Sequence, residues 1–385
     1  MFAPRSSNLR FAAKLITTNC MRLFGGAQRR ASLGRETGAA ATVGVHPPGE
    51  TTAQLRRVES RLHAVALEPG ERLAELALHG IEAGGKRLRP ALVISSAIAV
   101  GGHTAVSERV IDAATAVELL HLASLYHDDV LDSAPLRRDR PSANALWGNH
   151  AAVLGGDVLL AHAYRVAASL GPAELRRFAQ TLTELCAGQL AESAALFDRE
   201  RAIADYQASI RAKTATLLST SCWLGAATAG ATPRTADALA CFGMEIGIAF
   251  QIVDDVLDLY GESHATGKLA GSDLRAGVFT LPVLMTLQRD PTLIGLLVEE
   301  IDEPGVREVA RRVQAAGADR RAVALALDHL QVALAHLGDP GLRREGTHLL
   351  VAIAELVRGP LNRLGLASAP RARPSLVAEP EVDAA

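Results

Sequence analysis

Apolar residues recur three or four positions apart from residue 51 onward, which is the period of α-helices that bury one face. Leu55, Val58, Leu62 and Val65 form the first such series. No stretch shows the sustained alternation of a β-strand. Glycine and proline residues interrupt the pattern and leave about ten to thirteen segments of helical length between them. The pattern therefore predicts one all-α domain over residues 51–366.

The two ends of the chain lack this pattern. Residues 1–50 carry seven basic residues and one acidic residue before Glu50, and residues 367–385 are rich in proline, alanine and glutamate. We expect a basic, disordered extension at the N-terminus and a disordered tail at the C-terminus. A basic, acid-poor N-terminus is also typical of organelle transit peptides, so an organellar location is the alternative to the cytoplasm.

The composition narrows the class of protein. Hydrophobic residues make up 49% of the chain and aromatic residues only 4%, as in packed helical proteins. The net charge of −2 argues against a nucleic-acid-binding protein. The four cysteines form no CxxC pair, so we expect reduced thiols. The longest apolar run, residues 90–102, is shorter than the about 20 residues that cross a bilayer, so the chain is not expected to be transmembrane.

The sequence Asp-Asp-Val-Leu-Asp occurs twice, at residues 128–132 and 254–258. On a helix, carboxylates at positions i, i+1 and i+4 point toward one side, where their like charges repel. A solvated acidic face is the alternative for one copy, but two copies within apolar sequence favour a bound cation. Mg²⁺ shared with substrate phosphates suits such ligands. The candidate metal ligands are Asp128, Asp129, Asp132, Asp254, Asp255 and Asp258.

Basic residues near these motifs are candidates for phosphate binding. Residues 84–90 read GGKRLRP, and Pro90 is predicted to open a helix, whose N-terminus attracts anions. Two arginines follow the first acidic motif, where they can bind phosphate oxygens or pair with the aspartates. Only four of the 40 basic residues are lysines, and three of them lie in the main domain. The basic candidates are Lys86, Arg89, Arg137, Arg138, Lys213 and Lys268.

Three uncharged polar residues occur in otherwise apolar helical sequence. His121 precedes Asp128 by seven residues, about two helical turns, and so shares its side of the helix. Gln251 precedes Asp254 by three residues, and Thr214 follows Lys213. The oxygen atoms of Gln251 and Thr214 are suited to stabilising a cation in a dry pocket, although ordinary buried hydrogen bonding is the alternative. A lone helical histidine such as His121 is more often a core residue.

In order and spacing, these motifs resemble those of the trans-isoprenyl diphosphate synthases over about residues 50–360. The resemblance is carried by GGKRLRP, His121, HDDVLD with the arginine pair, Gly188-Gln189, Lys213-Thr214, FQIVDDVLD, Lys268 and Asp273. It implies an isoprenoid synthase-type helical bundle around a central active-site cavity, a homodimer, and Mg²⁺ held by both acidic motifs. It also implies consecutive addition of isopentenyl diphosphate to an allylic diphosphate, such as farnesyl or geranylgeranyl diphosphate.

The resemblance also implies a role for each candidate. The metal and nearby cations would neutralise the allylic diphosphate so that its C–O bond ionises, and the double bond of isopentenyl diphosphate would attack the resulting cation. This chemistry needs no side-chain nucleophile. In this scheme Lys213, Lys268 and Arg137 bind the allylic diphosphate, Lys86, Arg89, His121 and Arg138 bind isopentenyl diphosphate, and Thr214 and Gln251 stabilise the cation.

Two positions depart from the usual family pattern. Asp139 stands where a glycine commonly follows the arginine pair, and Val278 stands where a lysine often follows Gly277. Each makes the surroundings of a diphosphate less positive. We therefore expect weaker binding of the allylic diphosphate but not inactivity.

Small residues precede the first acidic motif where, in this family, a bulky aromatic residue closes the product tunnel. Ala123 is the fifth residue before Asp128, and Ser124 is beside it. Leu119 and Leu120 lie deeper on the same helix, by roughly one turn of about 5.4 Å. We expect a long product of about six to ten isoprene units (C30–C50), as the resemblance suggests with depth counted in helix turns, for a quinone side chain.

Three other hypotheses of function are open. A geranylgeranyl diphosphate synthase differs only in where the tunnel is closed. A class I terpene cyclase has an aspartate-rich helix but little need for the basic residues at Lys86 and Arg89. A non-catalytic regulatory subunit of a heteromeric synthase would have lost aspartates from one motif, and this chain has lost none.

Overall fold

The computed structural model describes residues 49–68, 70–138, 140–260 and 270–363. The expected N-terminal extension and C-terminal tail, Asp139 and Lys268 lie outside the described residues. The expectations for them therefore stay predictions.

The described part of the chain is almost entirely helical, which confirms the predicted all-α class. It contains fourteen α-helices, slightly more than the sequence pattern suggested. They are α1 (Gly49–Leu67), α2 (Glu71–Glu82), α3 (Leu88–Gly101), α4 (Glu108–Leu131), α5 (Ala143–Leu170), α6 (Pro172–Ala194), α7 (Ile203–Ile210), α8 (Thr216–Thr228), α9 (Pro233–Tyr260), α11 (Ser272–Ala276), α12 (Leu281–Leu287), α13 (Glu303–Ala315), α14 (Ala318–His336) and α15 (Arg344–Arg363).

Short elements connect some of these helices. Two 3-10 helices, η2 (His103–Ala105) and η4 (Pro291–Leu296), and one π-helical turn, η3 (Arg211–Ala215), occur in the described residues. An antiparallel hairpin of two-residue strands, β1 (Leu136–Arg137) and β2 (Arg140–Pro141), follows α4. Strands this short show no alternation, so the sequence pattern did not predict the hairpin.

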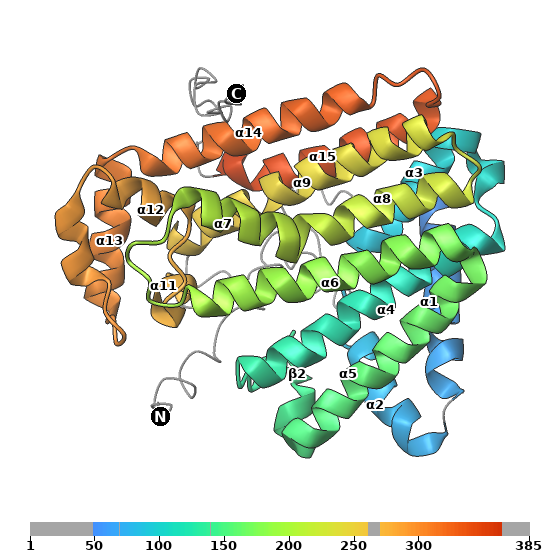
Figure 1. Ribbon diagram of the computed structural model, residues 1–385, viewed down its shortest axis with the longest axis horizontal. Coiled ribbons are helices and arrows are strands. Elements are labelled where there is room, and N and C mark those ends of the chain that lie inside the picture. Colours follow the sequence, from blue (N-terminus) through green and yellow to red (C-terminus); the bar gives the residue numbers. More distant parts are fainter. Residues whose placement is uncertain (1–48, 69, 139, 261–269, 364–385) are drawn as a thin grey trace, which may run out of the picture.

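The long helices pack side by side, as Figure 1 shows. Helix α14 packs on α9, α9 on α8, α8 on α3 and α4, and α4 on α5. Two clusters of buried hydrophobic side chains result, one centred on α9 and the other on α3, α4 and α5. The helices that carry the acidic motifs, α4 and α9, are thus central elements of the two clusters.

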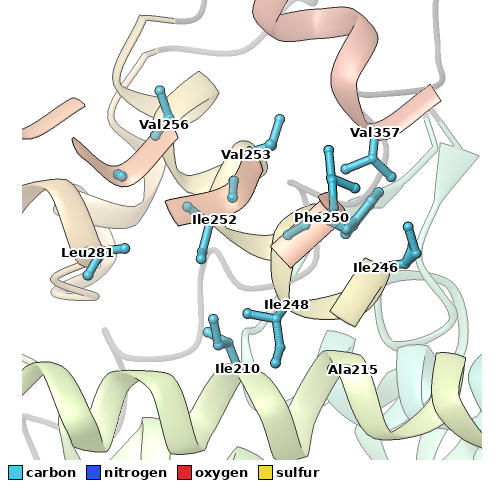
Figure 2. Close-up of a cluster of buried hydrophobic side chains, with 14 of the residues drawn as sticks. Ile210, Ala215, Ile246, Ile248, Phe250, Ile252, Val253, Val256, Leu281 and Val357 are labelled. Atoms are coloured by element: carbon cyan, nitrogen blue, oxygen red, sulfur yellow. The ribbon is translucent and has the colours of Figure 1, made fainter. Parts of the chain in front are cut away.

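Helix α9 is surrounded by apolar side chains. Fully burying a large aliphatic or aromatic side chain contributes about 1.5–3 kcal/mol, so this packing holds the second acidic motif firmly in place. Figure 2 shows six apolar side chains of α9 together with Ile210, Leu281 and Val357 from neighbouring elements. The six are Ile246, Ile248, Phe250, Ile252, Val253 and Val256.

Helix α9 is also the one described helix that is long and apolar enough to cross a membrane by length and composition. Of its most apolar window, 67% is buried inside the protein. Buried core helices pass the same test, and the packing of α9 against α8 and α14 identifies it as such a helix.

Candidate active site

The two acidic motifs lie at the C-terminal ends of α4 and α9. Residues 128–131 are the last residues of α4, and Asp132 caps that helix, whereas residues 254–258 lie within α9. Five of the six carboxyl side chains are buried, and that of Asp128 is half-buried. Burial raises the pKa of Asp128, and it raises the pKa of Asp255 to about 7. Such a concentration of buried carboxylates requires compensating positive charge.

Three of the six carboxylates accept hydrogen bonds from protein donors on both oxygens. Arg137 Nε lies 3.0 Å from Asp129 Oδ1 and 3.2 Å from Oδ2. Gln251 Nε2 donates to Asp255 Oδ1 at 2.9 Å, and the Tyr206 hydroxyl donates to Oδ2. The Ser272 hydroxyl and the Asp273 backbone N–H donate to the two oxygens of Asp258. Each oxygen has a second lone pair, so these bonds orient the carboxylates without using up their acceptor capacity.

Lys213 and Glu192 link the two motifs. Lys213 Nζ donates to Glu192 Oε1 of α6 at 2.5 Å, and both side chains are largely buried. Burial acts to lower the pKa of Lys213, but Glu192 and Asp128 outweigh it and raise that pKa. Glu192 also raises the pKa of Asp255, in the second motif. Glu192 was not among the residues predicted from the sequence, although it follows Gly188-Gln189 closely.

Thr214, Gln251 and Tyr206 form one hydrogen-bonded chain with the second motif. Thr214 Oγ1 donates to Gln251 Oε1 at 2.9 Å, and Gln251 Nε2 in turn donates to Asp255 Oδ1. Tyr206 of α7 completes it, and burial raises the pKa of its hydroxyl well above the usual value. The structure thus brings the predicted Thr214 and Gln251 together, and it adds Tyr206, for which the sequence gives no signal.

Asp273 also lies beside the second motif. Its side chain is buried, and its pKa is raised well above the usual value by burial and by the nearby Asp258 and Asp255. Val278, the departure from the family pattern, is half-buried in the next turn, and its backbone N–H donates to the Asp273 carbonyl at 2.9 Å. Its effect on binding stays a prediction.

A second cluster, of basic residues, lies beside the first motif. Burial, together with the positive charges of Arg89 and Arg138, lowers the pKa of His121 well below its usual value, so this imidazole is neutral. Burial lowers the pKa of Arg138 to about 10. Arg89 Nε and Arg138 Nη1 are buried with no hydrogen-bond partner among the described residues. Unsatisfied buried donors are rare in proteins, so these two point to a missing anion or water.

The start of α3 differs from the prediction. Pro90 is the third residue of α3 rather than the first, because the helix begins at Leu88. Arg87 caps the N-terminus of α3 and has a left-handed backbone conformation with φ of 52°. Its guanidinium binds Glu118 Oε1 at 2.8 Å and Glu59 Oε1 at 2.5 Å, so it ties three helices together. Lys86, by contrast, is exposed to solvent.

Replacing Arg87 with alanine is expected to destabilise the protein by about 3–5 kcal/mol, because the change leaves the buried Glu118 carboxylate without its partner. Urea unfolding measures this loss. The matched control is Arg56→Ala, which removes an exposed arginine from α1 and should leave the stability nearly unchanged. Equal stabilities of the two variants would contradict the structural role of Arg87.

The residues that are predicted to set product length lie on α4. Leu119, Leu120 and Ala123 are buried, and Ser124 is half-buried with its hydroxyl donating to the His121 carbonyl at 2.8 Å. A small cavity lies nearby, lined in part by His79, Tyr126, Arg137 and Arg138. That cavity belongs to the basic cluster, and a tunnel beyond Ala123 stays a prediction.

The charges divide the site into two halves. Around the acidic motifs, eight carboxyl groups face two described cations, and the donor set consists of hard oxygen ligands that fit a divalent metal ion. No group of three or more His, Cys, Asp and Glu side chains among the described residues is close enough to hold an ion alone. A metal ion here would therefore take further ligands from water or from a phosphate group. The eight acids are Asp128, Asp129, Asp132, Glu192, Asp254, Asp255, Asp258 and Asp273, and the cations are Arg137 and Lys213.

The amino-acid sequence is similar to those of known proteins. Residues 70–313 match the family model of polyprenyl synthetase. The chain is 41% identical over 236 residues to nonaprenyl diphosphate synthase of Mycobacterium tuberculosis, covering 61% of this chain and 70% of that protein. It is 40% identical over 304 residues to heptaprenyl diphosphate synthase component 2 of Geobacillus stearothermophilus, covering 78% and 93%.

A solved structure also matches the fold. The polyprenyl synthase of Caulobacter crescentus, crystallised with calcium and isoprenyl diphosphate, superposes with a TM-score of 0.71 at 29% identity. The match covers 83% of this chain and 95% of that chain.

Proposed function

Since the chain belongs to the polyprenyl synthetase family and is a prenyltransferase, we propose that it makes a long all-trans polyprenyl diphosphate. It adds isopentenyl diphosphate repeatedly to farnesyl or geranylgeranyl diphosphate, and its product has about six to ten isoprene units, because the small Ala123 is expected to let the chain grow along α4 in turns of about 5.4 Å. One observation carries this function. Lys213 and Glu192 join the two acidic motifs, and a separate arginine cluster lies beside the first of them. The long-chain relatives favour it over a geranylgeranyl diphosphate synthase.

The metal is proposed to be Mg²⁺, held by the six aspartates of the two motifs. Bound there with the allylic diphosphate, it supplies the positive charge that makes diphosphate a good leaving group. The hydrogen bonds from Arg137, Gln251 and Ser272 hold three of the carboxylates in fixed orientations, which lowers the cost of organising the site. The Caulobacter relative, crystallised with calcium and isoprenyl diphosphate, supports the binding of a divalent cation.

The protein's own residues then divide the remaining work. Lys213 and Arg137, with Lys268, bind the leaving diphosphate, while Thr214 and Gln251 direct oxygen atoms toward the allylic cation. The C–O bond of the allylic substrate breaks, and its cationic carbon bonds to the terminal alkene carbon of isopentenyl diphosphate. The positive charge then lies on the methyl-bearing carbon next to it. The CH2 group on the other side of that carbon loses a proton to the departing diphosphate, and a new double bond forms between the two carbons.

Isopentenyl diphosphate occupies the basic cluster in this proposal. Arg89 and Arg138 are half-buried, and each offers it a buried N–H group, while the neutral His121 offers a hydrogen bond without further charge. Lys86 lies at the exposed side, where it meets the diphosphate from solvent. Separate anion sites for the two substrates are what consecutive condensation requires.

The experiment that tests this function measures incorporation of radiolabelled isopentenyl diphosphate into farnesyl diphosphate. We expect incorporation with Mg²⁺ and none after treatment with a chelator, with recovery when Mg²⁺ is restored. Absence of incorporation under all conditions would contradict this function. It would favour a regulatory subunit, which is active only together with a separate catalytic chain.

The active form is proposed to be a cytoplasmic homodimer that pairs through α5 and α6. Four large apolar side chains are exposed on these two helices, and exposed apolar patches mark interaction sites. They are Leu146, Val153 and Leu154 of α5 and Leu190 of α6. The double change Leu154→Glu and Leu190→Glu should therefore shift the sedimentation mass from dimer to monomer. Val332→Glu, at an exposed position of α14, is the matched control that should leave the dimer intact.

One result would overturn the homodimer, and another would overturn only its proposed interface. Sedimentation of the unaltered protein as a monomer that is inactive alone would contradict the homodimer and would agree with a component of a heteromeric enzyme, as the name of the Geobacillus relative describes. A dimer mass retained by the double variant would mean that the interface lies elsewhere.

A further inference from the structure

Lys213 and Thr214 lie on a π-helical turn that interrupts the otherwise continuous helix formed by α7 and α8. The backbone N–H of Thr216 donates to the carbonyl of Arg211, five residues earlier, as a π-turn requires. Such a turn holds one more residue than an α-helical turn, so it changes the directions in which its side chains point. Single π-turns are rare and often coincide with functional sites.

The two helices that flank this turn approach it through glycines. A Cβ atom at Gly188 of α6 would lie 2.6 Å from the Lys213 backbone nitrogen. A Cβ atom at Gly247 of α9 would lie 2.4 Å from Ala215 Cα and 2.7 Å from Ala215 Cβ. These neighbours are backbone or backbone-proximal atoms that cannot rotate away, so any side chain at either glycine forces its helix and the turn apart.

Each glycine lies four residues before the polar residue that binds the turn. Gly188 precedes Glu192, which accepts from Lys213 at 2.5 Å, and Gly247 precedes Gln251, which accepts from Thr214 at 2.9 Å. Residues four apart share one face of a helix, so the close approach and the hydrogen bond occur on the same face. The glycines thus set the distance over which both hydrogen bonds form.

We propose that Gly188 and Gly247 are positioning residues for the reaction, acting through Lys213 and Thr214. This glycine clamp holds the π-turn between α6 and α9 so that Lys213 faces the acidic motifs and Thr214 faces Gln251. The inference rests on the proposed function of Lys213 and Thr214 at the allylic diphosphate. Neither glycine touches substrate itself.

The test is steady-state kinetics of Gly188→Ala and Gly247→Ala, with each substrate varied in turn. A displacement near 1 Å at a reacting group costs about 100-fold, so we expect that loss in kcat/KM for farnesyl diphosphate. The KM for isopentenyl diphosphate should stay unchanged, because Arg89, His121 and Arg138 lie on other elements. A general loss of folding would instead lower the amount of active enzyme and leave both KM values alone.

Gly243→Ala is the matched control. Gly243 lies one turn before Gly247 on α9, and a Cβ atom there would lie 2.6 Å from the Leu218 carbonyl oxygen of α8, beyond the π-turn. We expect this variant to lose thermal stability but to keep its kinetics. The clamp is overturned if Gly243→Ala loses kcat/KM for farnesyl diphosphate as Gly188→Ala and Gly247→Ala do. It is also overturned if Gly188→Ala and Gly247→Ala both fail to fold while Gly243→Ala folds.

Lys213→Gln separates the clamp from the proposed function. If this variant leaves the KM for farnesyl diphosphate unchanged, then Lys213 does not bind the allylic diphosphate and the proposed function of the turn is wrong. If Lys213→Gln raises that KM and the two glycine variants do not, only the clamp is wrong.

Discussion

Alanine at Asp128 or Asp254 is expected to lower kcat by about 1000-fold or more, the effect of losing several kcal/mol of metal-dependent stabilisation of the transition state. Both carboxylates lie among other acids, and burial raises the pKa of Asp128 because its charged form is poorly solvated there. Removing one of these acids relieves repulsion in the protein without its metal. The thermal stability without metal should therefore stay the same or increase, while activity is lost.

The control for this pair is Asp237→Ala, which removes an exposed carboxylate from α9 well away from the second motif. It should leave both kcat and stability unchanged. Full turnover by Asp128→Ala, measured as incorporation of labelled isopentenyl diphosphate, would falsify the metal mechanism.

Phenylalanine at Ala123 is expected to shorten the product to about three or four isoprene units, since this position lies only about 7.5 Å along α4 from Asp128. Ala123 is buried on α4, so the ring has no route to solvent and fills the space that a growing chain would enter. Overpacking should cost about 1–3 kcal/mol of stability as well. Reversed-phase chromatography of the dephosphorylated products measures the change in length.

Leu122→Phe is the matched control for Ala123→Phe. It places the same ring one residue earlier, about 100° around the helix, at a position that is also buried. This variant should keep the product length of the unaltered enzyme. An unchanged product from a folded Ala123→Phe variant would mean that the chain does not grow past this position.

The sequence predicted those parts of the site that depend on local spacing. Two identical acidic motifs at helical spacing predicted carboxylates gathered on one side of each of two helices, and α4 and α9 carry the two motifs. The Arg137 and Asp129 pair was one of two outcomes that the sequence left open, and the structure shows it. Short-range periodicity and charge were sufficient for these residues.

The parts that the sequence did not predict depend on contacts between distant segments. Arg87 belongs to the GGKRLRP segment, whose helix N-terminus was predicted to attract anions, yet it pairs with Glu59 and Glu118, which are 28 and 31 residues away. Tyr206 reaches Asp255 across 49 residues. A π-turn leaves no hydrophobic pattern of its own, because the apolar period on either side of it is that of an α-helix. Such features become visible only when the packing of the helices is known.

Product length tests the account most directly. Purified protein is incubated with Mg²⁺, farnesyl diphosphate and an excess of radiolabelled isopentenyl diphosphate, and the dephosphorylated products are separated by reversed-phase chromatography. We predict products of about thirty or more carbons, as expected for a tunnel that is open at Ala123 and extends along α4. A sharp stop at geranylgeranyl diphosphate would contradict the account, because Leu119, Leu120 or a residue of another helix would then close the tunnel.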